Sequence, residues 1–184
     1  CSSDLCNVLL YKGDHLVCMF PAYQSLYEVA RSVGCDVSFW RFRQTARGWV
    51  LDFDELESLL RPDTRAIVIN SPHNPTGYAL SEAELRALCE LAARRGIRLI
   101  ADEVYKGLED PDGPDENAGR ARSSVCELYE RGVSIGVLSK AYGLPGLRIG
   151  WLASRDRETL TALSRFKNYL SICCATPSEE LALT

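Results

Sequence analysis

Short apolar, β-prone runs alternate with amphipathic segments along this chain, and this alternation constrains the fold more than any other feature. Segments with helical spacing, which lie at 23–32, 53–60, about 81–95 and 155–170, separate most of the runs. The expected strands are the runs 16–20, 65–70, 97–102, 133–138 and 149–153, together with 36–42, in which apolar and polar residues alternate. Strands that are apolar on both faces and joined by helices form mostly parallel sheets. The pattern therefore predicts an α/β fold, a three-layer sandwich around a mostly parallel sheet.

The helix near residue 82 carries the clearest boundary signals. Ser81 and Glu84 have the spacing of a capping box, in which the hydroxyl accepts from the Glu84 amide and the carboxylate reaches back. Gly96 follows two arginines and is expected to end this helix in the left-handed conformation. Residues 109–122 are rich in Pro, Gly and Asp, so an exposed loop is expected there.

The composition is that of an ordinary globular protein, with 184 residues, 46% of them hydrophobic and 25% charged. A net charge of −4 gives no electrostatic footprint for a nucleic acid and no basic anchor for a membrane. No apolar run approaches the ~20 residues that span a bilayer, and nothing resembles a signal peptide. A cytoplasmic protein without nucleic-acid or membrane partners is therefore expected.

The eight cysteines favour free thiols over a disulfide scaffold, because no Cys-x-x-Cys pair occurs. Cysteine is a common small core residue, so buried thiols are expected at the six positions inside apolar or helical stretches. These are Cys18, Cys35, Cys89, Cys126, Cys173 and Cys174. His15 and His73 are interpreted as loop residues. Because they are far apart and paired cysteines are lacking, no metal site is expected.

Lys140 occupies a chemically unusual position, after the apolar run 133–138 and among small residues and glycines. A lysine amine in water has a pKa of about 10.4 and is a poor nucleophile. At the end of a buried strand, beside other cations, it can lose its proton and form a Schiff base. Arg148 offers a permanent charge and a fork of donors suited to a phosphate. A carbonyl cofactor that carries a phosphate satisfies both residues, and pyridoxal 5′-phosphate is such a cofactor.

Polar and aromatic side chains also follow other predicted strands, and ligands of open α/β sheets bind beyond the carboxyl ends of strands. Asn74 lies in a turn with two prolines and a glycine, which is either a plain connection or a rigid loop whose amide meets a ligand hydroxyl. Asp102 is either a helix cap or a partner for a pyridine nitrogen, with Tyr105 projecting nearby. Tyr23 either packs in the core or stacks on a cofactor ring.

Three motifs together resemble the class I/II aminotransferases, which are pyridoxal-phosphate enzymes of fold type I. They are Asn-Pro-Thr-Gly at 74–77, Asp-x-x-Tyr at 102–105, and Ser-Lys at 139–140 with an arginine after seven further residues. The resemblance covers essentially all of residues 1–184. It implies the cofactor-binding large domain, without the N-terminal segment and the small domain of these enzymes. It also implies that Lys140 is the catalytic residue, which binds the cofactor as a Schiff base and shuttles a proton.

The resemblance implies a contact with the cofactor for five further residues. Asp102 would pair with the pyridine nitrogen. Asn74 and Tyr105 would hydrogen-bond the phenolic oxygen. Tyr23 would stack on the ring, and Arg148 would bind the phosphate.

The phosphate site departs from the family pattern at one position. Many members carry a phosphate-binding serine three positions before the lysine, where this chain has Val137. Ser139 is the nearby hydroxyl and is the remaining candidate for that contact.

The implied activity is amino-group transfer between an amino acid and a 2-oxo acid, in a homodimer. One alternative keeps the cofactor but cyclises or oxidises an arginine-type amino acid, since residues 166–172 resemble a stretch common in such enzymes. Another is a pyridoxal-phosphate-binding effector domain of a transcription regulator, which the acidic balance does not support. The substrate itself cannot be read from these residues.

Overall fold

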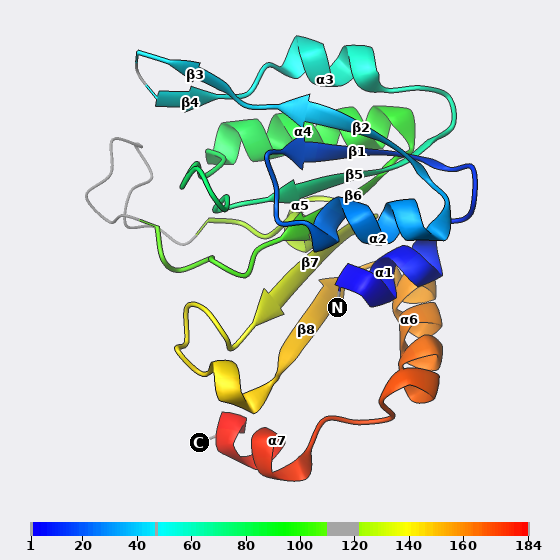
Figure 1. The fold of residues 1–184 in the computed structure, drawn as a ribbon, viewed down its shortest axis with the longest axis vertical. Helices are drawn as coiled ribbons and strands as arrows, with labels where there is room; N and C mark the ends of the chain where they lie inside the picture. Colours follow the sequence, from blue (N-terminus) through cyan, green and yellow to red (C-terminus); the bar gives the residue numbers. More distant parts are fainter. Residues whose placement is uncertain (1, 47, 110–121, 184) are drawn as a thin grey trace.

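A six-stranded sheet runs through the computed structural model, which describes residues 2–46, 48–109 and 122–183 (Figure 1). The strand order is β2-β1-β5-β6-β7-β8, and every neighbouring pair is parallel except the antiparallel pair β7–β8. The strands are β1 His15–Phe20, β2 Asp36–Arg41, β5 Thr64–Asn70, β6 Arg98–Asp102, β7 Gly132–Val137 and β8 Gly150–Ser154. The predicted mostly parallel sheet is confirmed.

Helices cover both faces of this sheet, so the three-layer architecture is confirmed as well (Figure 1). One face packs against α1 Ser2–Leu9, α2 Ser25–Val33 and α6 Arg157–Leu170. The other face packs against α3 Phe53–Leu59, α4 Glu82–Arg95 and α5 Val125–Leu128. The remaining elements are the hairpin β3 Arg43–Thr45 with β4 Gly48–Val50, the 3-10 helix η1 Pro145–Leu147, and α7 Thr176–Leu183.

Successive residues of the central strands enter two different hydrophobic cores. In β1, Val17 and Met19 belong to the core beneath α3 and α4, whereas Leu16 and Cys18 belong to the core beneath α1, α2 and α6. All four side chains are almost completely buried. A strand buried on both faces reads as a continuous apolar run, because its side chains alternate between two apolar layers. This is why β1, β5, β6 and β7 can be recognised as apolar runs. The six predicted strands agree with the structure to within one residue at each end.

Both signals that were predicted to begin and end α4 are found in the structure. The Ser81 hydroxyl accepts from the Glu84 amide at 3.2 Å, and the Glu84 carboxylate accepts from the Ser81 amide at 2.7 Å. Gly96 ends the helix with a φ of 65°, the left-handed conformation that glycine adopts without a steric penalty. Most of the predicted loop at 109–122 lies outside the described residues.

His15 is not a loop residue, so that prediction is wrong. It is the first residue of β1 and is fully buried. Its Nδ1 lies 2.7 Å from Thr64 Oγ1 and its Nε2 lies 2.9 Å from Ser38 Oγ. The flanking strands β5 and β2 thus supply a hydroxyl to each ring nitrogen, and burial lowers the pKa of the imidazole. His73, by contrast, does lie in a loop, although it is buried.

Burial is confirmed for three of the six predicted thiols and is wrong for the other three. The described cysteines are free, and Cys18, Cys35 and Cys89 are buried as predicted. Cys173 is exposed because the turn after α6 faces solvent, and Cys126 and Cys174 are only partly buried. Within the described ranges, no helix has the length and apolarity needed to span a membrane.

Gly136 allows the two antiparallel strands to pack closely. It is the Cα partner of Trp151 across the β7–β8 pair, and a Cβ added at this position would overlap the Trp151 indole.

We therefore expect Gly136→Ala to lower the free energy of unfolding by about 1–2 kcal/mol, as overpacking does. Urea denaturation measures this. Gly146→Ala is the control, since no atom lies within 4 Å of an added Cβ there. Equal losses for the two variants would contradict the packing argument.

Candidate active site

A cavity of about 600 Å³ opens beside the carboxyl ends of β5, β6 and β7. All seven side chains predicted from the sequence line it, although they come from segments far apart in the chain. They are Tyr23, Asn74, Asp102, Tyr105, Ser139, Lys140 and Arg148. The parallel register explains this convergence, because parallel strands end at the same edge of a sheet and their following residues meet there.

Asp102 is the last residue of β6 and is partly buried. Burial raises the pKa of its carboxyl to about 6, against the usual 3.8, while the Lys140 charge acts in the opposite direction. Its Oδ1 accepts from the Val104 amide at 3.3 Å. The residues that follow form turns and not a helix, so the helix-cap interpretation is wrong. A partly buried carboxylate of this kind is stabilised by a cationic group placed beside it.

Two hydrogen-bonding groups lie together near this carboxylate. Asn74 Nδ2 is 3.4 Å from the Tyr105 hydroxyl oxygen, which places an amide and a phenol side by side on the cavity wall. The turn that carries Asn74 is tied to the end of β5, because the Asn74 amide nitrogen donates to Asn70 Oδ1 at 2.7 Å. Asn70 also lines the cavity. Sequence reasoning missed it, although an asparagine that ends an otherwise apolar strand was an available signal.

The loop between β7 and β8 carries Lys140, whose side chain is exposed and not buried with its strand. The Lys140 Nζ lies 5.6 Å from the centre of the Tyr105 ring, within the range of a cation–π contact. The Leu144 amide donates to the Leu138 carbonyl and the Gly143 amide to the Lys140 carbonyl, both at 3.0 Å. These bonds close the loop around the lysine.

Arg148 has a φ of 56°, a left-handed conformation that is uncommon for a residue with a side chain. Its Nη1 donates to the Pro145 carbonyl at 2.8 Å, and the side chain is exposed at the cavity. Tyr23 lies in the connection between β1 and α2, and it is 61% exposed. Core packing is therefore excluded for Tyr23. Its ring is available to a ligand in the cavity.

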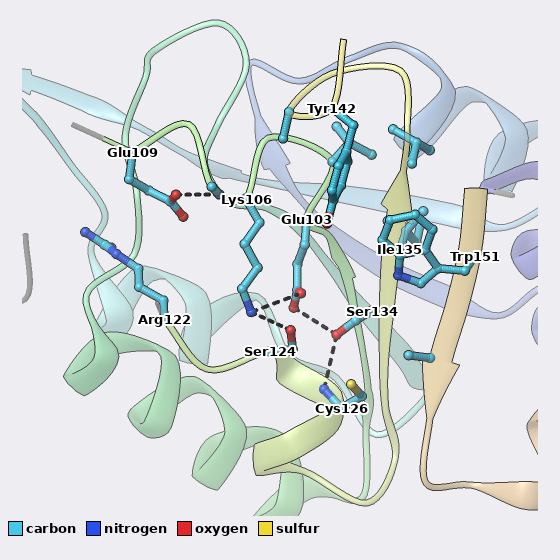
Figure 2. A pocket seen from close by; sticks show the side chains of 16 residues that line it. Glu103, Lys106, Glu109, Arg122, Ser124, Cys126, Ser134, Ile135, Tyr142 and Trp151 are labelled. Atoms are coloured by element: carbon cyan, nitrogen blue, oxygen red, sulfur yellow. Dashed lines mark hydrogen bonds and ion pairs between the residues drawn. The ribbon is translucent and has the colours of Figure 1, made fainter. Parts of the chain in front are cut away.

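A second cavity, of about 680 Å³, lies on the α5 side of β6 and β7 (Figure 2). Its polar groups pair with one another. Glu103 Oε1 accepts from the Ser134 hydroxyl at 2.8 Å and from the Val125 amide at 2.9 Å. Lys106 Nζ donates to the Ser124 hydroxyl at 2.5 Å and lies 3.9 Å from Glu103 Oε2 (Figure 2). Because these paired groups hold α5 to the sheet, we place the candidate active site in the other cavity, which Asp102 and Lys140 line.

Comparison with known proteins decides the family. The family model "Aminotransferase class I and II" matches residues 2–184. The chain belongs to this family.

Across the described residues, no group of three or more His, Cys, Asp or Glu side chains is arranged to hold a metal ion.

Individual aminotransferase-family relatives are similar over almost the whole chain. Capreomycidine synthase of Streptomyces vinaceus and the probable N-succinyldiaminopimelate aminotransferase DapC of Mycobacterium tuberculosis are each 32% identical over 169 residues, 92% of this chain and 41% of theirs. A solved pyridoxal-phosphate-dependent aminotransferase from Streptococcus suis matches with a TM-score of 0.87 and 32% identity, over 98% of this chain and 46% of that one. The chain thus spans less than half the length of these relatives.

The partly buried Asp102 makes the stability of this chain depend on pH. Because its folded pKa is about 6 and its usual value is 3.8, the folded state holds the proton more tightly than the unfolded chain between these values. Its contribution to stability therefore falls as the pH rises from about 4 to about 6, and stays low above that range. In cofactor-free protein, we expect Asp102→Asn to be more stable than wild type at pH 7 by about 2 kcal/mol, and to lose this advantage towards pH 4.

Urea denaturation of both proteins at pH 4 and pH 7 measures this difference. An advantage that is the same at the two pH values would show that the Asp102 carboxyl does not titrate as proposed.

Proposed function

We propose that this chain is the cofactor-binding large domain of a pyridoxal-phosphate-dependent aminotransferase that moves an amino group between an amino acid and a 2-oxo acid. The observation that carries the proposal is the convergence of Lys140, Asp102 and Arg148 on one cavity. When bound, this cofactor supplies an electron sink for the carbanion formed at the substrate α-carbon. Family membership supports amino acids and 2-oxo acids as the substrate classes.

The donor and acceptor set of the cavity fits this cofactor. Burial disfavours the charged form of Asp102, and the protonated nitrogen of a pyridine ring beside it would offset that cost. Arg148 presents a forked guanidinium suited to a phosphate, and its side chain is exposed at the cavity. Tyr23 presents an exposed aromatic ring. A lysine, a partly buried carboxylate, an arginine and an aromatic ring are therefore within reach of one ligand.

Each side chain has a distinct proposed task. Asp102 would keep the ring nitrogen protonated, because a carboxylate and a protonated nitrogen placed side by side each stabilise the charged form of the other. Asn74 and Tyr105 donate to the ring oxygen; their polar atoms are close enough to meet at one acceptor. Lys140 would hold the cofactor and would be the base that moves the proton at the substrate α-carbon.

The phosphate would be held by fewer hydroxyls here than in many members of the family. Val137 lines the cavity where those relatives have a serine, and a valine offers no hydrogen bond. Arg148 and Ser139, which line the same cavity, remain as the proposed phosphate contacts. The affinity of this chain for the phosphate should accordingly depend strongly on the guanidinium of Arg148.

A second candidate function is a synthase that uses the same cofactor to cyclise or oxidise an arginine-type amino acid. It is favoured by the similarity to capreomycidine synthase, which equals the similarity to the aminotransferase DapC. We propose transamination first, because the matching family model is that of the aminotransferases, and DapC and the Streptococcus suis protein are both named as aminotransferases.

Supplying candidate amino acids with and without a 2-oxo acid, while oxygen uptake is recorded, separates these two functions. Keto-acid formation that requires the 2-oxo acid supports transamination. Turnover of an arginine-type amino acid without any acceptor supports the synthase and would contradict transamination.

Lys140 is the expected attachment point of the cofactor. Purified protein mixed with pyridoxal 5′-phosphate should show a visible absorbance band, and Lys140→Ala should lose it. Lys106→Ala is the matched control, since Lys106 lines the second cavity, and it should keep the band. After borohydride reduction, peptide mass mapping should find the cofactor on Lys140. A wild type without the band, or a label on Lys106, would contradict the proposed site.

A further inference from the structure

Asn70 links two parts of the candidate site through one side-chain amide. Its Nδ2 donates to the Asp102 carbonyl at 2.8 Å, and its Oδ1 accepts from the Asn74 amide nitrogen at 2.7 Å. The residue is 2% exposed and lines the same cavity as Asp102 and Asn74. The two hydrogen bonds therefore join the ends of β5 and β6 to the turn that follows β5.

The two partners of Asn70 are otherwise held by different elements. Asp102 is the Cα partner of Asn70 in the β5–β6 register, and its carbonyl also accepts from the Ser71 amide at 3.1 Å. The Asn74 turn closes on itself, with the Gly77 amide donating to the His73 carbonyl at 2.8 Å. The Ser71 bond holds the start of the turn, and the Asn70 side chain is the group that joins the Asn74 backbone itself to the end of β6.

We propose that Asn70 is a positioning residue. By accepting a hydrogen bond from the Asn74 backbone, it fixes where the side-chain amide of Asn74 lies relative to Asp102. This inference rests on the proposed function, in which Asn74 donates to the ring oxygen of the cofactor. An asparagine side chain combines a donor and an acceptor on one short planar group, which both partners of this link require. Aspartate would supply acceptors only, and leucine would supply neither.

The consequence for a bound cofactor is electrostatic. A hydrogen bond from Asn74 stabilises the ionised ring oxygen, and therefore lowers the pH at which the visible absorbance of the bound cofactor changes. When Asn70 is lost, the Asn74 turn is free to shift and this hydrogen bond weakens. The pH midpoint of the absorbance change should then rise, and the cofactor should bind more weakly.

We expect Asn70→Leu to raise this pH midpoint by about 0.5–1 pH unit and to weaken cofactor binding about tenfold. Asn70→Ala carries the same expectation, should the leucine variant fail to fold. The measurements are an absorbance titration with pH and a cofactor titration followed by fluorescence, and neither depends on turnover.

Thr64→Val is the matched control for loss of stability alone. Thr64 is buried at the opposite end of β5, where its Oγ1 lies 2.7 Å from His15 Nδ1 and accepts from the Arg61 amide at 2.8 Å. The control therefore also loses two side-chain hydrogen bonds from the same strand, but far from the cavity. It should lower stability and leave the pH midpoint unchanged.

A double-mutant cycle with Asn74→Ala tests whether Asn70 acts through Asn74. In the Asn74→Ala background, Asn70→Leu should add little further shift to the midpoint. An Asn70→Leu midpoint equal to wild type, or an equal shift in both backgrounds, would overturn the inference while the proposed function stands. A wild type that gives no visible band with the cofactor would overturn both.

Discussion

The parallel register of β5, β6 and β7 is the constraint on which the candidate site depends. Asn70 is paired with Asp102, and Asp102 with Ile135, so the three strands end at one edge of the sheet. Both faces of these strands are committed to hydrophobic cores, where an unpaired polar side chain would be costly. Polar residues therefore accumulate beyond the carboxyl ends, and the lysine, carboxylate and amide of the cavity all lie there.

Two consecutive carboxylates at this edge show how position determines chemistry. Glu103 faces the α5 side, where Ser134, the Val125 amide and Lys106 surround it, and it holds α5 to the sheet (Figure 2). Asp102 faces the other cavity, where burial raises its pKa to about 6. A carboxylate that is already well paired stabilises the fold, whereas one whose charge is disfavoured by burial is suited to receive a cationic ligand group.

Features set by local pattern could be predicted from the sequence, and features set by distant partners could not. The six strands of the main sheet, the Ser81–Glu84 capping box and the strand-end residues of the cavity depend on neighbours in the chain or on the general rule for parallel sheets. The short hairpin strands β3 and β4 were not predicted. His15 was misread because its hydroxyl partners, Thr64 and Ser38, are 49 and 23 residues away. Asn70 was missed because its link to Asp102 spans 32 residues. An apolar run also carries no information on strand direction, so the antiparallel β8 was not anticipated.

A crystal structure of the protein grown with pyridoxal 5′-phosphate tests the central claim most directly. The account predicts electron density that is continuous with the Lys140 side chain, with a ring nitrogen within hydrogen-bond distance of the Asp102 carboxylate. Density in the cavity beside Glu103 and Lys106, or attached to a lysine other than Lys140, would contradict it.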